Sequence, residues 1–410
     1  MKTYTETIEL KGHLIDSLIL PKVLDEVLSQ GGSFDIKELR IGHTRSEPSY
    51  AQIEVAAPTP ALLHNILGRV KAHGADVVNE GDVVLEPAPQ DGVFPQGFYV
   101  TTNLPTSIRH RGEWVALERT RMDCGIAFDP QTRRAWPLRF SHVKRGDLIV
   151  VSHLGVRVQP KERAHPGNVF EFMNSEVSAE RPKSAVIREI AREMRRTKEE
   201  GRKLLFVAGP SVVHTGAVPH AVKLIEMGYV DLLFAGNALA THDIEQALFG
   251  TALGIYLDKG IPAREGHENH MQAINAIRAV GSIRAAVESG LLKSGVMHAC
   301  ITRGIEFVLA GSIRDDGPLP DVITDVMVAQ EKMASLVPGV GLALMVGTML
   351  HSIATGNVLP AETRIVAVDI NPAVVTKLLD RGSFQTVGIV SDAEPFLREL
   401  VGALEREPLP

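Results

Sequence analysis

Residues 340–369 read VGLALMVGTMLHSIATGNVLPAETRIVAVD, and this stretch decides the fold of the larger part of the chain. Two near-continuous apolar runs, Leu342–Val346 and Arg364–Val368, are typical of strands that are buried on both faces. The segment between them has the length of a helix. A strand, a helix and a second buried strand in this order predict a βαβ unit with parallel strands.

The same alternation continues on both sides of this unit. Buried-strand runs occur at Leu204–Ala208, Val230–Ala235, Ile305–Ala310 and Thr386–Val390, with helical segments between them. Parallel sheets covered by helices on both faces require such runs. We therefore predict an α/β domain over residues 183–410, built on a Rossmann-like, doubly wound parallel sheet.

The first 90 residues have a different pattern. One amphipathic helix opens at Pro21 and a second is capped by Thr59, and strand-like runs lie between them at Phe34–Ile41 and Tyr50–Ala56. This order predicts a ferredoxin-like α+β module over residues 1–90. Because such modules commonly pair subunits, we expect a homo-oligomer, either a dimer or a tetramer.

Residues 91–182 are richer in strand and turn signals than in helical periodicity. Strands are expected at Gly97–Thr102, Glu113–Leu117, Asp147–Ser152 and Gly155–Val158. The proline-containing stretch 159–182 resembles a connector. This region is therefore predicted to be a β-rich middle unit.

Composition excludes several classes of protein. The chain has 410 residues, 44% of them hydrophobic, and a formal net charge of −6 without blocks of like charge, which disfavours nucleic acid as a partner. Its two cysteines rule out a disulfide framework. No apolar run is long enough to span a bilayer, and the N-terminus has no signal-peptide core. We therefore expect a cytoplasmic protein that does not bind membranes.

Small and polar residues follow the predicted parallel strands one after another. Ligands of open parallel sheets bind beyond the carboxyl ends of the strands, so these positions are the first place to look for a site. The segments are Gly209-Pro210-Ser211, Gly236-Asn237-Ala238, Gly311 to Asp316, Gly347-Thr348-Met349-Leu350-His351, Asp369, and Ser391-Asp392.

Gly347 and Asp369 form the most informative pair. A glycine between a strand and a helix start offers free backbone N–H groups to a pyrophosphate. An acidic residue about 20 residues further on, at the end of the next strand, accepts both ribose hydroxyls of adenosine and repels a 2′-phosphate. The pair predicts NAD, although the full G-x-G-x-x-G fingerprint is missing. The alternative is a plain turn glycine and a helix cap before Pro372.

A second candidate is Gly266-His267-Glu268-Asn269-His270, at the start of a helix. His267, Glu268 and His270 are candidates for proton transfer or substrate positioning. The H-E-x-x-H spacing of zinc sites is not met, so we expect no metal. Capping and core hydrogen bonds are the alternative for these side chains.

The β-rich region carries a third group of candidates. Asp123 is suited to hold a substrate ammonium group, and Cys124 is either a nucleophile or a small core residue. An arginine can hold a substrate carboxylate through a bidentate pair, with surface ion pairs as the alternative. The substrate-binding candidates are Asn103, Arg109, Arg119 and Arg139.

Several blocks of the sequence resemble a known family. The segment Phe98 to Val158, with Arg121-Met122-Asp123-Cys124-Gly125-Ile126, resembles the conserved region of plant lysine-ketoglutarate reductase/saccharopine dehydrogenase (LOR/SDH). The blocks 235–245, 266–270 and 346–351 extend the match. Together they resemble the archaeal and cyanobacterial ornithine cyclodeaminases of the arginine dihydrolase-linked type, over nearly the whole chain.

This resemblance implies the conversion of L-ornithine to L-proline and ammonia, with NAD as a recycled cofactor. It does not imply arginine hydrolysis, because the long N-terminal dihydrolase domain is lacking. Two alternatives remain: another NAD-dependent amino-acid dehydrogenase of the saccharopine type, and a non-enzymatic amino-acid and NAD sensor. The implied NAD contacts are Asn237, Ala238, Asp315, Thr348, Met349, Leu350, His351, Asp369 and Asp392.

Overall fold

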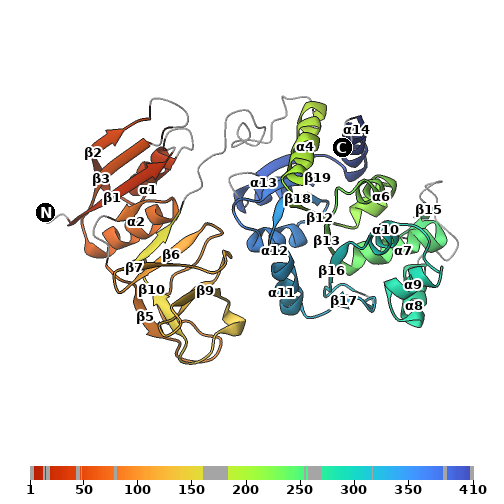
Figure 1. Cartoon of the computed structure of the whole chain (residues 1–410), viewed down its shortest axis with the longest axis horizontal. Coiled ribbons are helices and arrows are strands. Elements are labelled where there is room, and N and C mark those ends of the chain that lie inside the picture. Colours follow the sequence, from red (N-terminus) through yellow and green to blue (C-terminus); the bar gives the residue numbers. More distant parts are fainter. Residues whose placement is uncertain are drawn as a thin grey trace. The chain divides into compact units, whose positions relative to one another are not determined.

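The structure, a computed structural model, describes residues 4–12, 14, 19–42, 47, 49–77, 81–159, 183–253, 255–256, 269–315, 317–381 and 386–406. The chain forms two units, residues 1–167 and 168–410, whose elements are labelled in Figure 1. The boundary expected at residue 90 falls inside the first unit, and the division into three domains stays a prediction. Most of the expected connector, residues 160–182, lies outside the described residues.

The first unit begins with an antiparallel sheet covered by two helices. Its elements follow the order β1 (Tyr4–Gly12), α1 (Ile19–Ser29), β2 (Ser33–Arg40), β3 (Ser49–Ala57), α2 (Pro60–Ala72) and β4 (Asp76–Val77). The strands are arranged in the spatial order β2-β3-β1-β4, which is the ferredoxin-like arrangement. The predicted ferredoxin-like module is confirmed, and the short strand β4 completes it.

Local sequence explains why these elements form. Side chains of β3 alternate between buried and half-buried positions, because successive residues of a strand point to opposite faces. The Thr59 side chain accepts a hydrogen bond from the N–H of Leu62 and caps α2. Ile53 and Val55 of β3 then pack in the same core as Ile66 and Val70 of α2.

Two small sheets make up the β-rich part. One has the order β5-β10-β8-β9 and the other the order β11-β6-β7. The first contains β5 (Val84–Pro87), β10 (Leu148–Val151), β8 (Gly125–Asp129) and β9 (Arg134–Leu138); the second contains β11 (Val156–Val158), β6 (Thr106–His110) and β7 (Glu113–Ala116). A single-turn helix, η1 (Phe140–His142), follows β9.

The strand expected at Gly97–Thr102 is wrong. Gly97 has a φ of +77°, outside the range of a strand, and only an isolated bridge joins Phe98 to Val151. The hairpin of β8 and β9 was not anticipated from the pattern. Its turn carries Arg133 at a φ of +55°, where a glycine would have marked it in the sequence.

The second unit contains a seven-stranded sheet in which all neighbouring strands are parallel. Its spatial order is β17-β16-β13-β12-β18-β19-β20. The six strands predicted from the sequence are confirmed, with ends that differ by at most two residues. They are β12 (Lys203–Ala208), β13 (Leu232–Gly236), β16 (Glu306–Ala310), β18 (Val340–Val346), β19 (Arg364–Asp369) and β20 (Thr386–Val390), and the edge strand β17 (Val322–Ile323) joins them.

This strand order is that of the Rossmann fold. The chain winds outward from β12 to β13 and β16, then returns to the centre and winds the other way through β18, β19 and β20. The order reverses between β12 and β18, which lie side by side. The confirmed fold class therefore predicts ligand binding beyond the carboxyl ends of these two strands.

Helices cover both faces of the sheet. They are α4 (Lys183–Glu199), α5 (Ser211–His214), α6 (Val218–Glu226), α7 (Asn237–Phe249), α8 (Asn269–Val280), α9 (Ile283–Glu288), α10 (Val296–Arg303), α11 (Val326–Leu336), α12 (Leu350–Val358), α13 (Pro372–Arg381) and α14 (Ala393–Arg406). A short hairpin, β14 (Thr251–Ala252) with β15 (Ile255–Tyr256), follows α7. Among the described helices, none has the length and apolar character needed to cross a bilayer.

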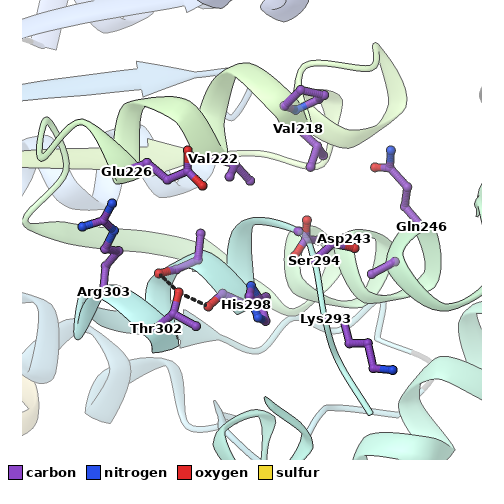
Figure 2. A pocket seen from close by; sticks show the side chains of 14 residues that line it. Val218, Val222, Glu226, Asp243, Gln246, Lys293, Ser294, His298, Thr302 and Arg303 are labelled. Carbon is purple, nitrogen blue, oxygen red and sulfur yellow. Dashed lines mark hydrogen bonds between the residues drawn. The ribbon is translucent and has the colours of Figure 1, made fainter. Parts of the chain in front are cut away.

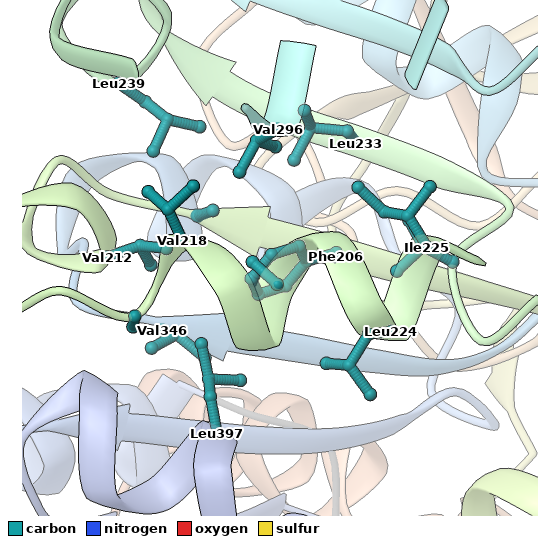
Figure 3. Packing of buried hydrophobic residues seen from close by; sticks show 14 of the residues in the cluster. Phe206, Val212, Val218, Leu224, Ile225, Leu233, Leu239, Val296, Val346 and Leu397 are labelled. Carbon is teal, nitrogen blue, oxygen red and sulfur yellow. The ribbon is translucent and has the colours of Figure 1, made fainter. Parts of the chain in front are cut away.

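The central strand β12 is buried on both faces. Leu204 and Phe206 belong to one hydrophobic cluster, and Leu205 and Val207 to another on the opposite face. Figure 3 shows Phe206 at the centre of the first cluster. Each such side chain contributes about 1.5–3 kcal/mol when it is fully removed from water. This double burial explains the near-continuous apolar runs in the sequence.

Candidate active site

Two glycines meet where the strand order reverses. Gly209 follows β12, and its N–H donates to the carbonyl of Val346 at 2.9 Å. Gly347 follows β18 with a φ of +62°, which side-chain-bearing residues rarely adopt. A Cβ on Gly209 would overlap the Gly347 carbonyl oxygen, and a Cβ on Gly347 would overlap Oγ of Ser211. Neither position has room for a Cβ, and backbone without Cβ atoms allows the close approach that a bound pyrophosphate requires.

The first turn of α12 extends this lining. Oγ1 of Thr348 lies 3.3 Å from Nδ1 of His351, and the His351 ring reaches Gly236 at the end of β13, where a Cβ would come within 2.8 Å of it. Burial lowers the pKa of His351, while the charge of Asp315 opposes this shift. The His351 ring thus reaches from α12, which follows β18, to the end of β13, on the other side of the point where the strand order reverses. Leu350 stays 72% exposed.

Asn237 fixes the loop that follows β16. Its buried Oδ1 accepts hydrogen bonds from the N–H of Leu319 at 3.0 Å and from Oγ1 of Thr241 at 3.3 Å. In the same loop, Oδ2 of Asp315 accepts from the N–H of Ser312 at 2.8 Å. Asn237 and Asp315 thus follow two neighbouring strands, β13 and β16. Ala238 lies in the first turn of α7, next to Asn237.

Asp369 and Asp392 stand at the ends of the neighbouring strands β19 and β20. Oδ1 of Asp369 accepts from the N–H of Asn371 at 2.9 Å, and Oδ1 of Asp392 accepts from the N–H of Ala393 at 2.7 Å. The Asp369 contact shapes the turn before α13, whereas the helix cap expected at Asp369 is provided by Asn371, whose Oδ1 accepts from the N–H of Ala373 at 3.0 Å. The predicted contact of Asp369 with a ribose stays a prediction.

The residues present fit NAD. Side-chain-free backbone lies at the crevice, and an acidic group ends the strand after it. These are the donor and acceptor types that a pyrophosphate and an adenosine ribose require. All ten residues predicted to contact the cofactor lie at the carboxyl edge of one sheet: Asn237, Ala238, Asp315, Gly347, Thr348, Met349, Leu350, His351, Asp369 and Asp392.

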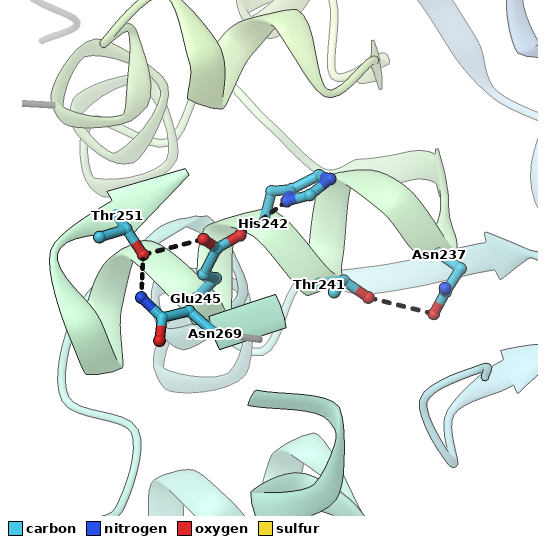
Figure 4. Close-up of polar contacts among 6 residues, drawn as sticks. All are labelled: Asn237, Thr241, His242, Glu245, Thr251 and Asn269. Carbon is cyan, nitrogen blue, oxygen red and sulfur yellow. Dashed lines mark hydrogen bonds and ion pairs between the residues drawn. The ribbon is translucent and has the colours of Figure 1, made fainter. Parts of the chain in front are cut away.

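Next to this edge is a histidine cluster that sequence reasoning missed. The ring of His214, at the end of α5, lies edge-on to the ring of His242 in α7, with centroids 4.8 Å apart. Nδ1 of His242 lies 2.8 Å from Oε2 of Glu245, which is fully buried. Figure 4 shows how Thr251 and Asn269 extend the network. The only sequence signal was the polar run 241–245 in a buried helix.

The expected 266–270 motif is partly visible. His267 and Glu268 lie outside the described residues, so their predicted roles stay predictions. Asn269 donates from Nδ2 to Oγ1 of Thr251 at 2.9 Å. The ring centroid of His270 lies 6.4 Å from that of His242. The described end of the motif thus adjoins the histidine cluster.

The predicted substrate residues lie in the first unit. Cys124 is buried, which raises the pKa of its thiol, and the charges of Arg121 and Arg139 oppose this shift. Asp123, Cys124 and Arg139 are thus brought together, and Asp123 is exposed with a φ of +60°. The burial of Cys124 favours its alternative as a core residue.

The remaining three candidates are more scattered. Nε of Arg109 lies 4.0 Å from Oδ1 of Asp82, as the ion-pair alternative expects. Arg119 is exposed, whereas Asn103 is buried. The structure therefore groups one of the three predicted arginines, Arg139, with Asp123 and Cys124.

A cavity of about 450 Å³ lies elsewhere in the second unit, between α6, α7 and α10 (Figure 2). None of the predicted site residues lines it. At its base, the buried carboxylate of Asp243 accepts hydrogen bonds from the N–H groups of Val296 at 2.7 Å and Met297 at 2.8 Å. Burial raises the pKa of Asp243 to about 6. Asp243 therefore anchors the start of α10.

The fold and the crevice define a dinucleotide-binding protein of the doubly wound class. Family models refine this class. Residues 188–400 match "Arginine dihydrolase ArgZ-like, C-terminal, Rossmann fold", and residues 105–187 match the first region of the same C-terminal part. The chain belongs to this ArgZ-like family, and the resemblance stated from the sequence is confirmed.

The match to the LOR/SDH conserved region corrects one detail. It covers residues 5–104, which are mainly the ferredoxin-like module, whereas the resemblance had been assigned to Phe98–Val158. Residues 105–158 of that segment, including Arg121 to Ile126, fall instead within the first ArgZ-like region.

Individual relatives agree with the family. An ornithine cyclodeaminase of Methanopyrus kandleri is 51% identical over 98% of this chain and 97% of the relative. A crystal structure of a LOR/SDH protein from Methanococcus maripaludis has a TM-score of 0.75 and 46% identity, covering 81% of this chain and 99% of that one. The ternary complex of AgrE with ornithine and NAD⁺ has a TM-score of 0.54 and 42% identity, covering 98% of this chain and 58% of that one.

Proposed function

We propose that this protein is an NAD-dependent ornithine cyclodeaminase, an ammonia-lyase that converts L-ornithine to L-proline and ammonia. The similarity to ornithine cyclodeaminases over nearly the full length of both chains carries this proposal. The AgrE complex holds ornithine and NAD⁺ together, and the loops of Gly209 and Gly347 offer the side-chain-free backbone that NAD needs.

NAD, when bound, would supply an acceptor for hydride from the substrate carbon and would return that hydride to the cyclic imine, which becomes proline. The chain's own residues hold the cofactor. Backbone N–H groups after Gly347 would face the pyrophosphate, and Asp369 would accept the ribose hydroxyls. Asn237 keeps the loop with Asp315 in place. The charge of Asp369 disfavours a 2′-phosphate, so NAD rather than NADP is the proposed cofactor.

Ring closure explains why one active site suffices for the reaction. Once the α-carbon of ornithine is an imine, its own δ-amine attacks that carbon and closes a five-membered ring. The bond to the α-nitrogen then breaks, and that nitrogen leaves as ammonia. An intramolecular attack of this kind gains a large effective concentration, provided that the substrate is held in the right shape. Water must be excluded, because it would hydrolyse the imine.

We propose substrate contacts among the residues predicted in the first unit. Arg139 is the favoured carboxylate clamp because it lies near Asp123, which would hold an ammonium group; Arg109, Arg119 and Asn103 remain candidates. His267, Glu268 and His270 remain candidates for proton transfer. A nucleophilic role for Cys124 is the weakest of these proposals, because burial raises the pKa of its thiol.

Product analysis tests the function. Purified protein is incubated with L-ornithine and NAD at one hundredth of the substrate concentration, with L-arginine and L-lysine as control substrates. We expect proline and ammonia in equal amounts from ornithine and no accumulation of NADH. Stoichiometric NADH would indicate a saccharopine-type dehydrogenase instead. Bound NAD with no turnover of any basic amino acid would indicate a sensor.

We further propose that the protein acts in the cytoplasm, in proline biosynthesis from ornithine, and as a homo-oligomer. Ile36 and Leu39 on β2 are apolar and exposed, which supports a subunit contact at this sheet. Light scattering coupled to gel filtration tests this proposal, and a dimer or tetramer is expected. An Ile36→Lys variant that leaves the measured mass unchanged would exclude β2 from the contact.

A further inference from the structure

His242 and Glu245 form a pair suited to proton transfer. Nδ1 of His242 lies 2.8 Å from Oε2 of Glu245, and Oε1 of this buried carboxylate accepts a hydrogen bond from Oγ1 of Thr251 at 2.8 Å. A carboxylate that faces one imidazole nitrogen fixes the orientation of the ring. It also stabilises the imidazolium that forms when the ring gains a proton.

The other nitrogen of His242 is directed away from this network, as Figure 4 shows. When Nδ1 carries the hydrogen that is donated to Glu245, Nε2 keeps its lone pair and accepts a proton. His242 is only 8% exposed, so bulk water has little access to the ring. The geometry is therefore that of an oriented base in a mostly dry environment.

His214, whose ring contacts that of His242, is not protonated at neutral pH. Burial lowers the pKa of His214 to about 4, and the neighbouring His242 is the second cause of this shift. Among the described residues, the other titratable or charged groups near the two rings are Glu245, His270 on α8, and Arg314 in the loop after β16. His214 therefore stays neutral at pH 7. His242 is the ring of the two that faces the carboxylate of Glu245.

The topology places this pair on the reacting side of the cofactor site. A dinucleotide in a doubly wound sheet straddles the point where the strand order reverses. An adenosine half at Asp369 leaves the other half facing the elements that follow β12 and β13. These elements are α5, which ends at His214, and α7, which begins at Asn237 and carries His242 in its second turn.

We propose that His242 accepts and returns the protons of the substrate's amino groups, and that Glu245 and His214 are its positioning residues. This assignment rests on the proposed function. A proton leaves the substrate ammonium for Nε2 of His242, and the freed lone pair stays on the amine nitrogen. The imidazolium later returns the proton to the amine that departs as ammonia. The protein thus neither gains nor loses a proton over the cycle.

Activity measurements against pH test the role of the pair. His242→Gln and Glu245→Gln are compared with His298→Gln, a control in the cavity wall on α10. We expect kcat at pH 7 to fall by about 100-fold or more in His242→Gln, as for the loss of a general base, and to recover as rising pH deprotonates the substrate. The control keeps kcat within twofold. A His242→Gln variant with the wild-type pH profile would overturn the proposal.

A second measurement does not depend on turnover. In ¹⁵N NMR spectra of the wild type, we expect His242 to hold its hydrogen on Nδ1, and Glu245→Gln to abolish this preference. Adding NAD with L-ornithine shifts the His242 signals but not those of His298, and both variants bind NAD within threefold of wild type. If the His242 signals do not shift when NAD and L-ornithine are added, the proposed role of His242 and Glu245 in proton transfer is wrong. A wild type with these signals but without proline formation overturns only the proposed function.

Discussion

Gly209 and Gly347 face each other so closely that a Cβ on Gly209 would overlap the carbonyl oxygen of Gly347. The two residues are more than one hundred positions apart in the sequence. They meet because β12 and β18 are neighbours at the centre of the sheet, where the strand order reverses. This contact keeps side chains out of the crevice that the cofactor is proposed to occupy.

The first prediction concerns this contact. Gly209→Ala forces the two loops apart, and we expect it to weaken NAD binding by at least tenfold and to destabilise the fold by about 1–3 kcal/mol. Gly356→Ala in α12 is the control, since a Cβ there meets no atom within 4 Å. It should leave NAD affinity unchanged and stabilise the helix by up to about 1 kcal/mol. Calorimetric titration and thermal melts measure both effects, and equal NAD affinity in the two variants would contradict the assignment.

A second prediction separates the ribose contact from helix capping. Asp369→Asn keeps an oxygen for the N–H of Asn371 but removes the charge, so we expect NAD affinity to fall by about 10–100-fold and discrimination against NADP to shrink. Asn371→Ala removes only the cap contact to the N–H of Ala373 and should cost about 1 kcal/mol of stability. If Asp369 served only to shape the turn, Asp369→Asn would leave NAD affinity unchanged.

The third prediction concerns the buried ion pair of Glu193 in α4 and Arg364 in β19. Arg364→Met leaves the carboxylate buried without its partner, which costs about 3–5 kcal/mol, and adding Glu193→Leu should recover most of this loss. Arg398→Ala breaks an exposed ion pair with Glu394 and should change stability by less than about 0.5 kcal/mol. Urea denaturation compares the variants, and equal losses in Arg364→Met and Arg398→Ala would refute the idea.

The same variant has a predictable pH dependence. Burial raises the pKa of Glu193 above its ordinary value of 4.5, although the charge of Arg364 opposes this shift. Without Arg364 the pKa rises further. A raised pKa in the folded state means that stability is fully present below pH 4.5 and is lost as the pH rises. Arg364→Met should therefore be closest to wild type near pH 5 and furthest from it near pH 8.

A fourth prediction follows from His214. Its pKa of about 4 in the folded protein is below its ordinary value of 6.5, mainly because of burial. Between pH 6.5 and pH 4, His214 is therefore protonated in the unfolded chain but not in the folded chain. The free energy of unfolding consequently decreases as the pH falls from 6.5 towards 4. We expect His214→Asn to reduce the stability lost between pH 7 and pH 5 by on the order of 1 kcal/mol. The effect is no larger because His214 is partly exposed and solvent screens its charge. Denaturation midpoints at pH 5 and pH 7 give the slope, and an unchanged slope would show that His214 is not responsible.

Much of the fold was accessible from the sequence, because burial on both faces leaves a local pattern. Strands such as Leu342–Val346 are apolar at every position, and Thr59-Pro60 marks a helix start directly. The failures lie where conformation is set by distant contacts. Arg133 turns the chain at positive φ without a glycine, and the two-residue strand β17 exists only because β16 lies beside it.

The candidate site could be predicted from the sequence to the same extent as the fold. Gly347 and Asp369 are recognisable because strand ends, spacing and charge are all local features. His214 is not recognisable in this way, because only its contact with His242 makes it a candidate site residue. His242 lies on a different helix, after a different strand, so the sequence near His214 does not indicate the contact. The relation of Asp123 and Arg139 to the cofactor stays a prediction, since they belong to the other unit.

Helix α7 performs three separate tasks within 13 residues. Asn237 holds the loop after β16, Asp243 anchors α10, and Glu245 orients His242. Local unfolding of α7 would break the contacts of all three residues at once. We therefore expect its backbone amides to exchange with deuterium only when the second unit unfolds as a whole. Three positions of α7 are therefore constrained by contacts with three different parts of the second unit, which leaves this helix little freedom to evolve.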